Sequence, residues 1–239
     1  MDHRARALRV TSTELLMVFA RAPEPGRAKT RLAATLGDEA AAALHGAFVL
    51  DVLDAHTRSD RRVVLYRTGD LRHALWSQVD PHVEQREQGE GDLGARMASA
   101  FAACLAESPG SRVIVLGTDS PALPPGRVDA AFAALIDHDA VVGPADDGGY
   151  YLLGLRRPCP ALFEGIAWGT SRVFEDTRAR LLDANCRWAL LDPEYDVDVE
   201  ADLVRLGHDV GALRSRGEPW PIRTATMLEA LGLAQTRGP

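Results

Sequence analysis

Short apolar runs rich in valine and leucine alternate along this chain with longer segments whose apolar residues recur at helical spacing. Runs of this kind are typical of strands buried on both faces, and their alternation with helices predicts an α/β fold with a mostly parallel sheet. The expected strands include 15–20, 62–66, 83–86, 113–116 and 187–191, and the expected helices are 38–57, 70–79, 93–107, 125–138, 170–185, 199–210 and 223–233.

The 239 residues show no internal repeat and no linker-like stretch, so we expect one domain over residues 14–235 after a flexible, arginine-rich tail, residues 1–13. No apolar run reaches the roughly 18 residues of a membrane helix, and the start lacks the apolar core of a signal peptide. Three scattered cysteines favour a reduced, cytoplasmic chain. The net charge of −7 argues against a nucleic-acid partner. The oligomeric state is left open.

In an open parallel sheet the ligand binds beyond the carboxyl ends of the strands. The stretch "FARAPEPGRAKTRLAATLG", residues 19–37, follows the first expected strand and holds Lys29, which is the single lysine among 27 basic residues. A glycine-containing loop with basic side chains suits phosphate binding, although a solvated surface turn is the alternative. The candidate phosphate-binding residues of this loop are Ala20, Arg21, Ala22, Pro23, Gly26, Lys29 and Arg31.

Asp119 lies in "GTDSPALP", directly after the apolar run 113–116. A carboxylate at a strand end can hold Mg²⁺ or Mn²⁺ against a diphosphate, and the neighbouring Thr118 would then face the nucleotide. The alternative is that Asp119 forms a turn. The position of this loop relative to the lysine-containing loop favours the functional interpretation.

A glycine-rich loop, "GPADDGGYYLLGL", supplies two more acids, Asp146 and Asp147. Either could act as a general base, bind a metal or hold a substrate hydroxyl, and a hairpin turn is the structural alternative. The paired glycines permit close approach of a ligand. The candidate substrate-binding residues here and in the later "WGT" stretch are Gly148, Gly149, Tyr150, Trp168, Gly169 and Thr170.

Two further acidic stretches are candidates for the same site. In "EYDVDVEADL", Asp196 and Asp198 alternate on an extended segment and therefore point the same way, as a metal pair would; capping of the next helix by Asp198 is the alternative. In "EGDLGARM", Asp92 and Arg96 are candidate nucleotide- or phosphate-binding residues, and capping of the following helix by Asp92 is the alternative.

Taken in order, "VFARAPEPGRAKTRLAATLG", "GDLGARM", "VLGTDSPALP", "GPADDGGYYLLGL" with "WGT", and "YDVDVEADL" resemble the motifs of a bacterial family of GT-A-type glycosyltransferases, some of them associated with radical-SAM and selenium-linked gene clusters. The resemblance runs from about residue 15 to about residue 206. It implies a nucleotide-diphospho-sugar transferase fold, with a Rossmann-like, three-layer α/β/α arrangement and a mixed, mostly parallel sheet. It also implies that Asp119 is the metal-binding aspartate. Gly117 replaces the first acid of the usual D-x-D pair.

Two pieces of the chain are similar to nucleotidyltransferases instead. "AKTRL" resembles the phosphate loop of phospholactate guanylyltransferases. "DVDVEADL" resembles the acidic ending of molybdenum-cofactor nucleotidyltransferases, with Val199 and Ala201 in place of threonine and proline.

We therefore expect first a metal-dependent glycosyltransferase that uses a nucleotide-sugar donor, a small-molecule acceptor, and Mg²⁺ or Mn²⁺ held by Asp119 and Asp198. The alternative is a nucleotidyltransferase that condenses a nucleoside triphosphate with a phosphorylated small molecule, and the basic loop favours it slightly. A nucleotide-sugar-binding regulator without turnover is a third hypothesis.

Overall fold

The computed structural model describes residues 13–57 and 60–233, and its strands form one mixed sheet in the order β3-β2-β1-β4-β6-β5-β7. β6 runs antiparallel to its neighbours β4 and β5, and every other pairing is parallel, as the sequence predicts. The strands are β1 (Glu14–Arg21), β2 (Arg62–Thr68), β3 (Glu84–Glu87), β4 (Arg112–Leu116), β5 (Ala140–Pro144), β6 (Tyr150–Leu155) and β7 (Trp188–Leu190).

Two of the predicted helices begin and end where the sequence places them, α2 (Asp38–Thr57) and α3 (Leu93–Glu107). The expected helix 70–79 is only a 3₁₀ turn, η1 (Ala74–Gln78), and a short helix that the sequence did not predict, α1 (Thr30–Leu36), precedes α2. Gly37, at a φ of 81°, separates α1 from α2. The remaining helices are α4 (Pro125–Ala134), η2 (Pro160–Phe163), α5 (Val173–Asp183), α6 (Glu200–Arg216) and α7 (Ile222–Ala230).

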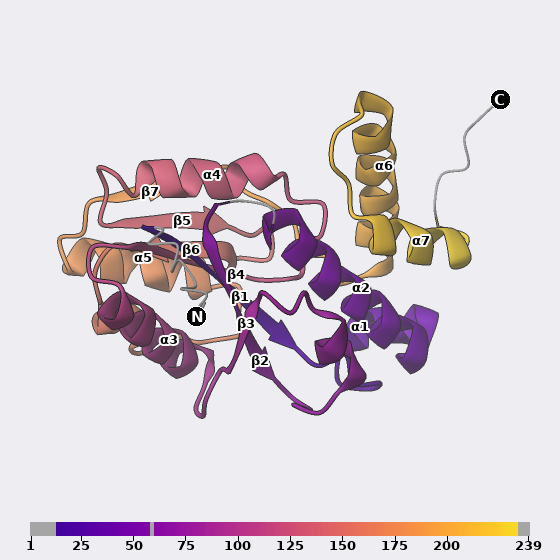
Figure 1. Cartoon of the computed structure of the whole chain (residues 1–239), viewed down its shortest axis with the longest axis horizontal. Helices are drawn as coiled ribbons and strands as arrows, with labels where there is room; N and C mark the ends of the chain where they lie inside the picture. Colours follow the sequence, from indigo (N-terminus) through magenta and orange to yellow (C-terminus); the bar gives the residue numbers. More distant parts are fainter. Residues whose placement is uncertain (1–12, 58–59, 234–239) are drawn as a thin grey trace, which may run out of the picture.

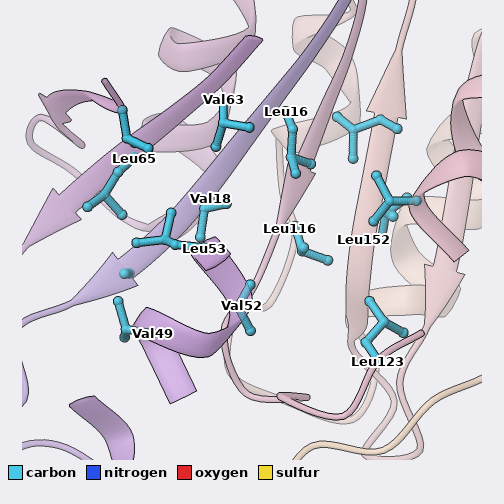
Figure 2. Close-up of a cluster of buried hydrophobic side chains, with 14 of the residues drawn as sticks. Leu16, Val18, Val49, Val52, Leu53, Val63, Leu65, Leu116, Leu123 and Leu152 are labelled. Carbon is cyan, nitrogen blue, oxygen red and sulfur yellow. The ribbon is translucent and has the colours of Figure 1, made fainter. Parts of the chain in front are cut away.

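The sheet is covered on both faces, which makes the three layers that the sequence predicts. In Figure 1, α4 lies on one side of the sheet, and α3 and α5 lie on the other. One buried cluster joins β1 and β2 to α2 and α4, and Figure 2 shows Leu53 of α2 lying close to Val18 of β1. The second cluster joins the opposite sides of the same strands to α3 and α5. Alternate residues of β1 therefore enter different clusters, as the two-residue period of a strand requires.

The last two helices, α6 and α7, pack against α1 and α2 at one end of the sheet rather than on a face of it (Figure 1). Their buried contacts include Leu32 of α1, Phe48 of α2 and Leu203 of α6. Asp51 of α2 strengthens this attachment, because its carboxylate accepts hydrogen bonds from two backbone amides in the first turn of α7, those of Arg223 and Thr224, at 3.1 and 2.7 Å. The packing of α6 places the segment that precedes it, residues 194–199, beside the loops at the carboxyl ends of β1 and β4.

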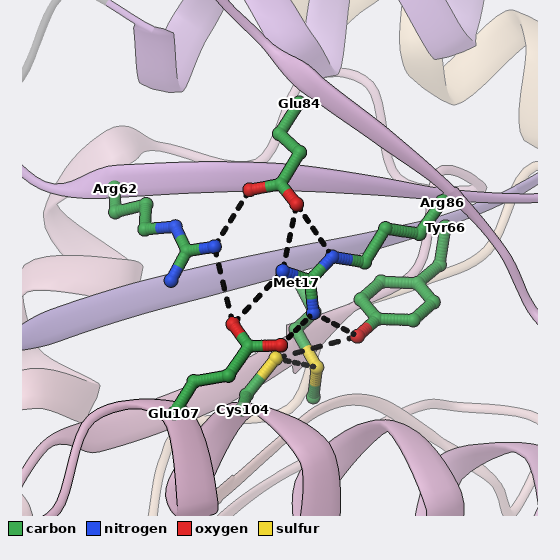
Figure 3. Close-up of polar contacts among 7 residues, drawn as sticks. All are labelled: Met17, Arg62, Tyr66, Glu84, Arg86, Cys104 and Glu107. Atoms are coloured by element: carbon green, nitrogen blue, oxygen red, sulfur yellow. Dashed lines mark hydrogen bonds and ion pairs between the residues drawn. The ribbon is translucent and has the colours of Figure 1, made fainter.

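The open edge of the sheet at β3 carries a network of ion pairs. Glu84 of β3 contacts Arg62 at 2.6 Å, and Arg86 of β3 contacts Glu107 of α3 at 2.7 and 2.8 Å (Figure 3). Charged side chains on an exposed edge strand oppose pairing with other chains. We assign this network to the protection of the edge.

The predicted tail lies almost wholly outside the described residues, so both the tail and the single-domain boundaries of 14–235 stay predictions. Within residues 13–57 and 60–233, no helix is both long enough and apolar enough to cross a bilayer.

Candidate active site

The candidate site is built by two loops that follow adjacent parallel strands and by the extended segment before α6. β1 ends at Arg21 and β4 ends at Leu116, so the loops that carry Lys29 and Asp119 leave the same edge of the sheet. The backbone amide of Val197 donates to the carbonyl of Asp119 at 2.9 Å, which aligns the acidic segment with the β4 loop. Three segments distant in sequence thus meet at one point.

Lys29 lies at the centre of this site. Its ammonium Nζ is 2.5 Å from Oδ1 of Asp119 and 2.9 Å from Oδ1 of Asp198. Only 5% of its side chain is exposed, whereas 45% of the Asp119 side chain and 37% of that of Asp198 remain exposed. The lysine therefore forms the floor of the site, and the two carboxylates form its open rim.

The backbone of Lys29 adopts the left-handed conformation, with a φ of 49°, at the residue before α1. A non-glycine residue is strained there. Such strain persists where the surrounding contacts impose it, and here the two carboxylates hold the ammonium. This combination of strain, burial and two anionic partners distinguishes Lys29 from a solvated surface lysine.

The charges of the cluster stabilise one another. Burial alone would lower the pKa of Lys29, but Asp119 and Asp198 outweigh it and raise that pKa above its ordinary value. Burial likewise opposes ionisation of Asp119, and the positive charge of Lys29 outweighs it and lowers the pKa of this carboxyl. The lysine is therefore cationic and Asp119 anionic at neutral pH.

Asp196, two residues before Asp198, has its pKa shifted in the opposite direction from that of Asp119. Burial, followed by the negative charge of Asp119, raises the pKa of Asp196 to about 7. Its Oδ1 accepts a hydrogen bond from the hydroxyl of Ser120 at 3.0 Å, which opposes the increase only in part. A carboxyl with a pKa near neutrality can exchange a proton at physiological pH.

His45 of α2 is a member of the site that the sequence analysis missed. It is 6% exposed, and its Nε2 lies 3.2 Å from the carbonyl oxygen of Arg21, at the end of β1. Its other ring nitrogen, Nδ1, is buried, has no hydrogen-bond partner and lies 4.0 Å from Oδ1 of Asp119. Burial lowers the pKa of His45, so its ring is neutral at physiological pH. Nothing in the helical spacing of 38–57 separates this residue from a core histidine.

Asp198 is free for the site because another acid caps the following helix. Oδ2 of Asp202 accepts hydrogen bonds from the backbone amides of Asp198 and Val199 at 2.9 and 2.8 Å. The alternative in which Asp198 caps α6 is therefore wrong, and Asp202, at the third position of α6, performs the capping.

The rest of the first loop supports Lys29 more through its backbone than through its side chains. Ala20, Ala22 and Pro23 are buried, and Gly26 supplies a turn at a φ of 72°. The side chains of Arg21 and Arg31 are exposed. Of the two, Arg31 approaches the cluster, with Nη1 3.9 Å from Oδ2 of Asp198. In the β4 loop, Thr118 is 3% exposed, so its side chain is part of the packed base of the loop.

Asp92 and Arg96, predicted to bind nucleotide, make contacts within their own loop. Asp92 caps α3 by accepting from the amide of Ala95 at 2.8 Å. The guanidinium of Arg96 donates to the carbonyl of Gly91 at 3.1 Å and to the side-chain oxygen of Gln88, also at 3.1 Å. These contacts fix the loop after β3, and the predicted nucleotide contacts stay predictions.

The two acids of the glycine-rich loop also differ. Asp146 forms an ion pair with Arg205 of α6 at 3.1 Å, and it is therefore held toward α6. Asp147 accepts from the amide of Gly149 at 2.8 Å and lies near enough to Asp196 to contribute to its raised pKa. Of these two candidate catalytic carboxylates, Asp147 is the one whose charge acts on Asp196.

Other predicted substrate-binding residues form the wall between this loop and α3. Tyr150 packs edge-on against Trp168, with ring centroids 6.4 Å apart, and its hydroxyl points to Sδ of Met97 at 3.7 Å. Trp168 lies against Gly94 so closely that a Cβ there would be 2.5 Å from its indole nitrogen. Packing therefore accounts for both aromatic rings. Three other candidates shape turns, namely Gly148 at a φ of 90°, Gly169 at a φ of 77°, and Thr170, whose hydroxyl donates to the carbonyl of Ala167.

The arrangement suits a cation and an anion held side by side. Two partly exposed carboxylates with a buried ammonium beneath them can orient a polyphosphate together with the cation that accompanies it. Among residues 13–57 and 60–233, no three histidine, cysteine, aspartate or glutamate side chains already converge as a metal-binding group. The lysine occupies the point where Asp119 and Asp198 meet.

The mixed, mostly parallel sheet covered by helices on both faces is the nucleotide-diphospho-sugar transferase fold, and the chain is a transferase of this fold. It belongs to the bacterial family described as "Uncharacterized protein conserved in bacteria (DUF2064)", whose model matches residues 50–170. The fold and the family thus agree with the resemblance in the sequence motifs.

Three relatives refine this class. The crystal structure of a protein from Desulfovibrio desulfuricans G20, assigned to the nucleotide-diphospho-sugar transferases, is 32% identical, has a TM-score of 0.84 and matches 93% of this chain and 96% of its own. A 3-phospho-D-glycerate guanylyltransferase of Phenylobacterium zucineum (strain HLK1) is 34% identical over 158 residues, 64% of this chain and 72% of its own length. A 2-phospho-L-lactate guanylyltransferase of Methanothermobacter thermautotrophicus (strain Delta H) is 34% identical over 134 residues, 54% of this chain and 56% of its own. These names favour nucleotidyl transfer, the alternative hypothesis of the sequence analysis, over sugar transfer, and an enzyme over a regulator without turnover.

Proposed function

We propose that this transferase moves a guanylyl group from GTP to the phosphate of a small phosphorylated carboxylic acid and releases pyrophosphate. The observation that carries the proposal is the meeting of Lys29, Asp119 and Asp198 at the carboxyl ends of β1 and β4, in a chain with two curated guanylyltransferase relatives. The substrates named for those relatives both combine a phosphate with a carboxylate, and this chemistry defines the acceptor class.

In the proposed reaction an oxygen of the acceptor's phosphate attacks the α-phosphorus of GTP. The new bond joins that oxygen to phosphorus, and the bond between the α-phosphorus and the bridging oxygen of the β-phosphate breaks, so pyrophosphate leaves with the electron pair. Charge grows on the leaving group, and fixed cationic groups stabilise it. Lys29 is the buried cation for this role, and the exposed Arg31 supplies a second one from the rim.

A divalent cation fits this site, since carboxylate oxygens are the ligands that Mg²⁺ and Mn²⁺ prefer. Asp119 and Asp198 would hold it, and the ammonium that both already bind shows that this point attracts positive charge. When bound, such an ion supplies charge neutralisation to the leaving diphosphate. Lys29 would then turn from the carboxylates toward a phosphate oxygen, which makes its flexible side chain more suitable than a planar guanidinium.

Sugar transfer is the second candidate, because the similar protein of Desulfovibrio desulfuricans G20 carries the name of the nucleotide-diphospho-sugar transferases. The two reactions share the binding of a diphosphate but release different products. A nucleotide sugar would yield a nucleoside diphosphate, whereas GTP with a phosphorylated acid would yield pyrophosphate.

The test is to incubate the purified protein with Mg²⁺ or Mn²⁺, GTP and each of 3-phospho-D-glycerate and 2-phospho-L-lactate, and to measure pyrophosphate. Other nucleoside triphosphates and a set of nucleotide sugars serve as competing donors. We expect pyrophosphate that depends on both GTP and an acceptor, and we expect Asp119→Asn to abolish it. The matched control, Asp137→Asn, changes an exposed aspartate that follows α4. A nucleoside diphosphate released from a nucleotide sugar, without pyrophosphate from GTP, would replace this proposal with sugar transfer.

A further inference from the structure

His45 raises a question that the proposed function leaves open, because a polar atom without a partner is costly to bury. Its Nδ1 is completely buried and makes no hydrogen bond, although this atom lies only 4.0 Å from Oδ1 of Asp119. Buried histidines normally satisfy both ring nitrogens. This atom therefore points to a ligand.

The tautomer of the His45 ring follows from the contact that Nε2 makes. The carbonyl oxygen of Arg21 can only accept, so the contact at 3.2 Å requires that Nε2 of His45 carry the hydrogen and donate. In the neutral ring Nδ1 then has a free lone pair. A histidine that binds a metal almost always donates its second ring N–H to a backbone carbonyl or a carboxylate, which fixes the tautomer and the orientation of the ring. His45 has this arrangement.

The distance requires a small movement. Bonds from a transition metal to imidazole nitrogen and carboxylate oxygen are about 2.0–2.2 Å long, so two donors at tetrahedral or cis-octahedral angles on one ion lie about 3.0–3.5 Å apart. Nδ1 of His45 and Oδ1 of Asp119 are 4.0 Å apart, and the Asp119 side chain, which is 45% exposed, would have to rotate toward the ring to share an ion with it. The ammonium of Lys29 presently contacts the same carboxylate oxygen at 2.5 Å. Nδ1 of His45 thus lies beside a point that already holds a cation, and an ion that displaces Lys29 there would draw the ring and the two carboxylates together.

We propose that Nδ1 of His45 is a protein ligand of the divalent cation together with Asp119 and Asp198, and that the site consequently prefers a first-row transition metal ion to Mg²⁺. Imidazole nitrogen binds transition metals much better than it binds Mg²⁺, which takes oxygen ligands. A site of two carboxylates alone would carry no such preference. Lys29 competes with the ion for the carboxylates, and its removal strengthens metal binding.

This inference rests on the proposed function only in that both use the same site, and it is tested without nucleotide or acceptor. Mn²⁺ is added to the wild-type protein and to Lys29→Met, which lacks the competing ammonium. Pulsed EPR then detects whether a ¹⁴N nucleus is bonded to the manganese. We expect a directly coupled nitrogen, and labelling the histidines with ¹⁵N should replace its signal by that of ¹⁵N. This measurement needs no substitution at His45.

The substitution His45→Gln gives the second readout, in both backgrounds. Glutamine can keep the donor to the Arg21 carbonyl while it removes the imidazole lone pair. Loss of outer contacts to a metal ligand costs about 10- to 100-fold in affinity, so loss of the ligand itself should weaken Mn²⁺ binding by at least about tenfold and change Mg²⁺ binding less. The matched control, His82→Gln, changes an exposed histidine outside the site and should leave both affinities and the nitrogen signal unchanged.

Two results would overturn the proposal. The first is Mn²⁺ bound with no coupled nitrogen, which would leave the carboxylates as the only protein ligands. The second is no binding of Mn²⁺ to either the wild type or Lys29→Met. Failure of the guanylyltransferase assay would not affect either result, since binding is measured with the metal alone.

Discussion

Replacing Lys29 by arginine tests whether the site needs the shape of this side chain or only its charge. The ammonium lies 2.5 Å from one carboxylate and 2.9 Å from another, with 5% of the side chain exposed. A guanidinium is longer and planar, and its charge is spread over three nitrogens, so it cannot place one compact cation between the two oxygens. We therefore expect Lys29→Arg to behave much as Lys29→Ala does.

The magnitude follows from the role of the lysine. Removing one preorganised donor to a developing negative charge typically costs about 100- to 1,000-fold in rate, or about 2.7–4 kcal/mol of activation free energy. Forcing extra atoms into a filled site costs a further amount in stability, about 1–3 kcal/mol. Lys29→Arg should thus lose at least about 100-fold in kcat and unfold at a lower temperature than the wild type.

The assay measures pyrophosphate release under saturating GTP and acceptor, together with thermal unfolding of each variant. Arg31→Lys is the matched control. It exchanges the same two residue types beside the same carboxylate, with Nη1 of Arg31 3.9 Å from Oδ2 of Asp198, but at a side chain that is 74% exposed and free to adjust. It should lose much less activity. A Lys29→Arg variant with the wild-type rate would refute the argument from shape, and a Lys29→Ala variant with the wild-type rate would remove Lys29 from the site.

Three further predictions concern backbone strain and buried charge. Lys29→Gly should be more stable than Lys29→Ala by about 1 kcal/mol in urea unfolding, since glycine relieves the left-handed φ of 49°; equal stabilities would show that this backbone is unstrained. Burial, followed by the charge of Arg61, lowers the pKa of His56 from 6.5 to about 4, so the unfolded chain gains its proton first as the pH falls. The free energy of unfolding should then decrease by up to about 3 kcal/mol between about pH 7 and pH 4, and by less in His56→Gln; parallel curves would contradict this. Gly148→Ala, with a φ of 90° and a Cβ only 2.1 Å from the carbonyl oxygen of Ser171, should lower the Tm by several degrees, whereas Gly126→Ala in α4, with nothing within 4 Å, should not.

The sequence predicted most of the elements because their causes are local. Apolar residues at helical spacing predicted α3 at 93–107, a long apolar segment that begins at Asp38 predicted α2 at 38–57, and the run before Asp119 marked β4. Local signals also placed Lys29 in the loop after the first strand and Asp119 in the loop after β4. Because the carboxyl ends of parallel strands lie at the same edge of a sheet, both residues were expected at that edge. The short α1 escaped prediction because a loop rich in proline and glycine leads into it, and Gly37 divides it from α2.

Roles that depend on distant partners required the tertiary structure. Asp146 and Asp147 look equivalent in the sequence, but Asp146 pairs with Arg205 of α6, whereas Asp147 accepts from Gly149 and acts on the pKa of Asp196. Asp198 becomes available because Asp202 caps α6 in its place. Neither outcome follows from the spacing of residues in the sequence, since each depends on which side chain or backbone amide the fold places next to the carboxylate.

By itself, then, the sequence determined the fold class, and it predicted the edge of the sheet at which the candidate site lies and the single lysine proposed for it. Only the folded chain decided that this lysine is buried between Asp119 and Asp198, because α6 and α7 must pack on α1 and α2 before residues 194–199 can reach the β4 loop. It also decided that His45 faces the same carboxylate. The physical reason is that residues 44–53 of α2 are all buried, so the sequence pattern shows that the helix is enclosed but not what lies opposite each side chain.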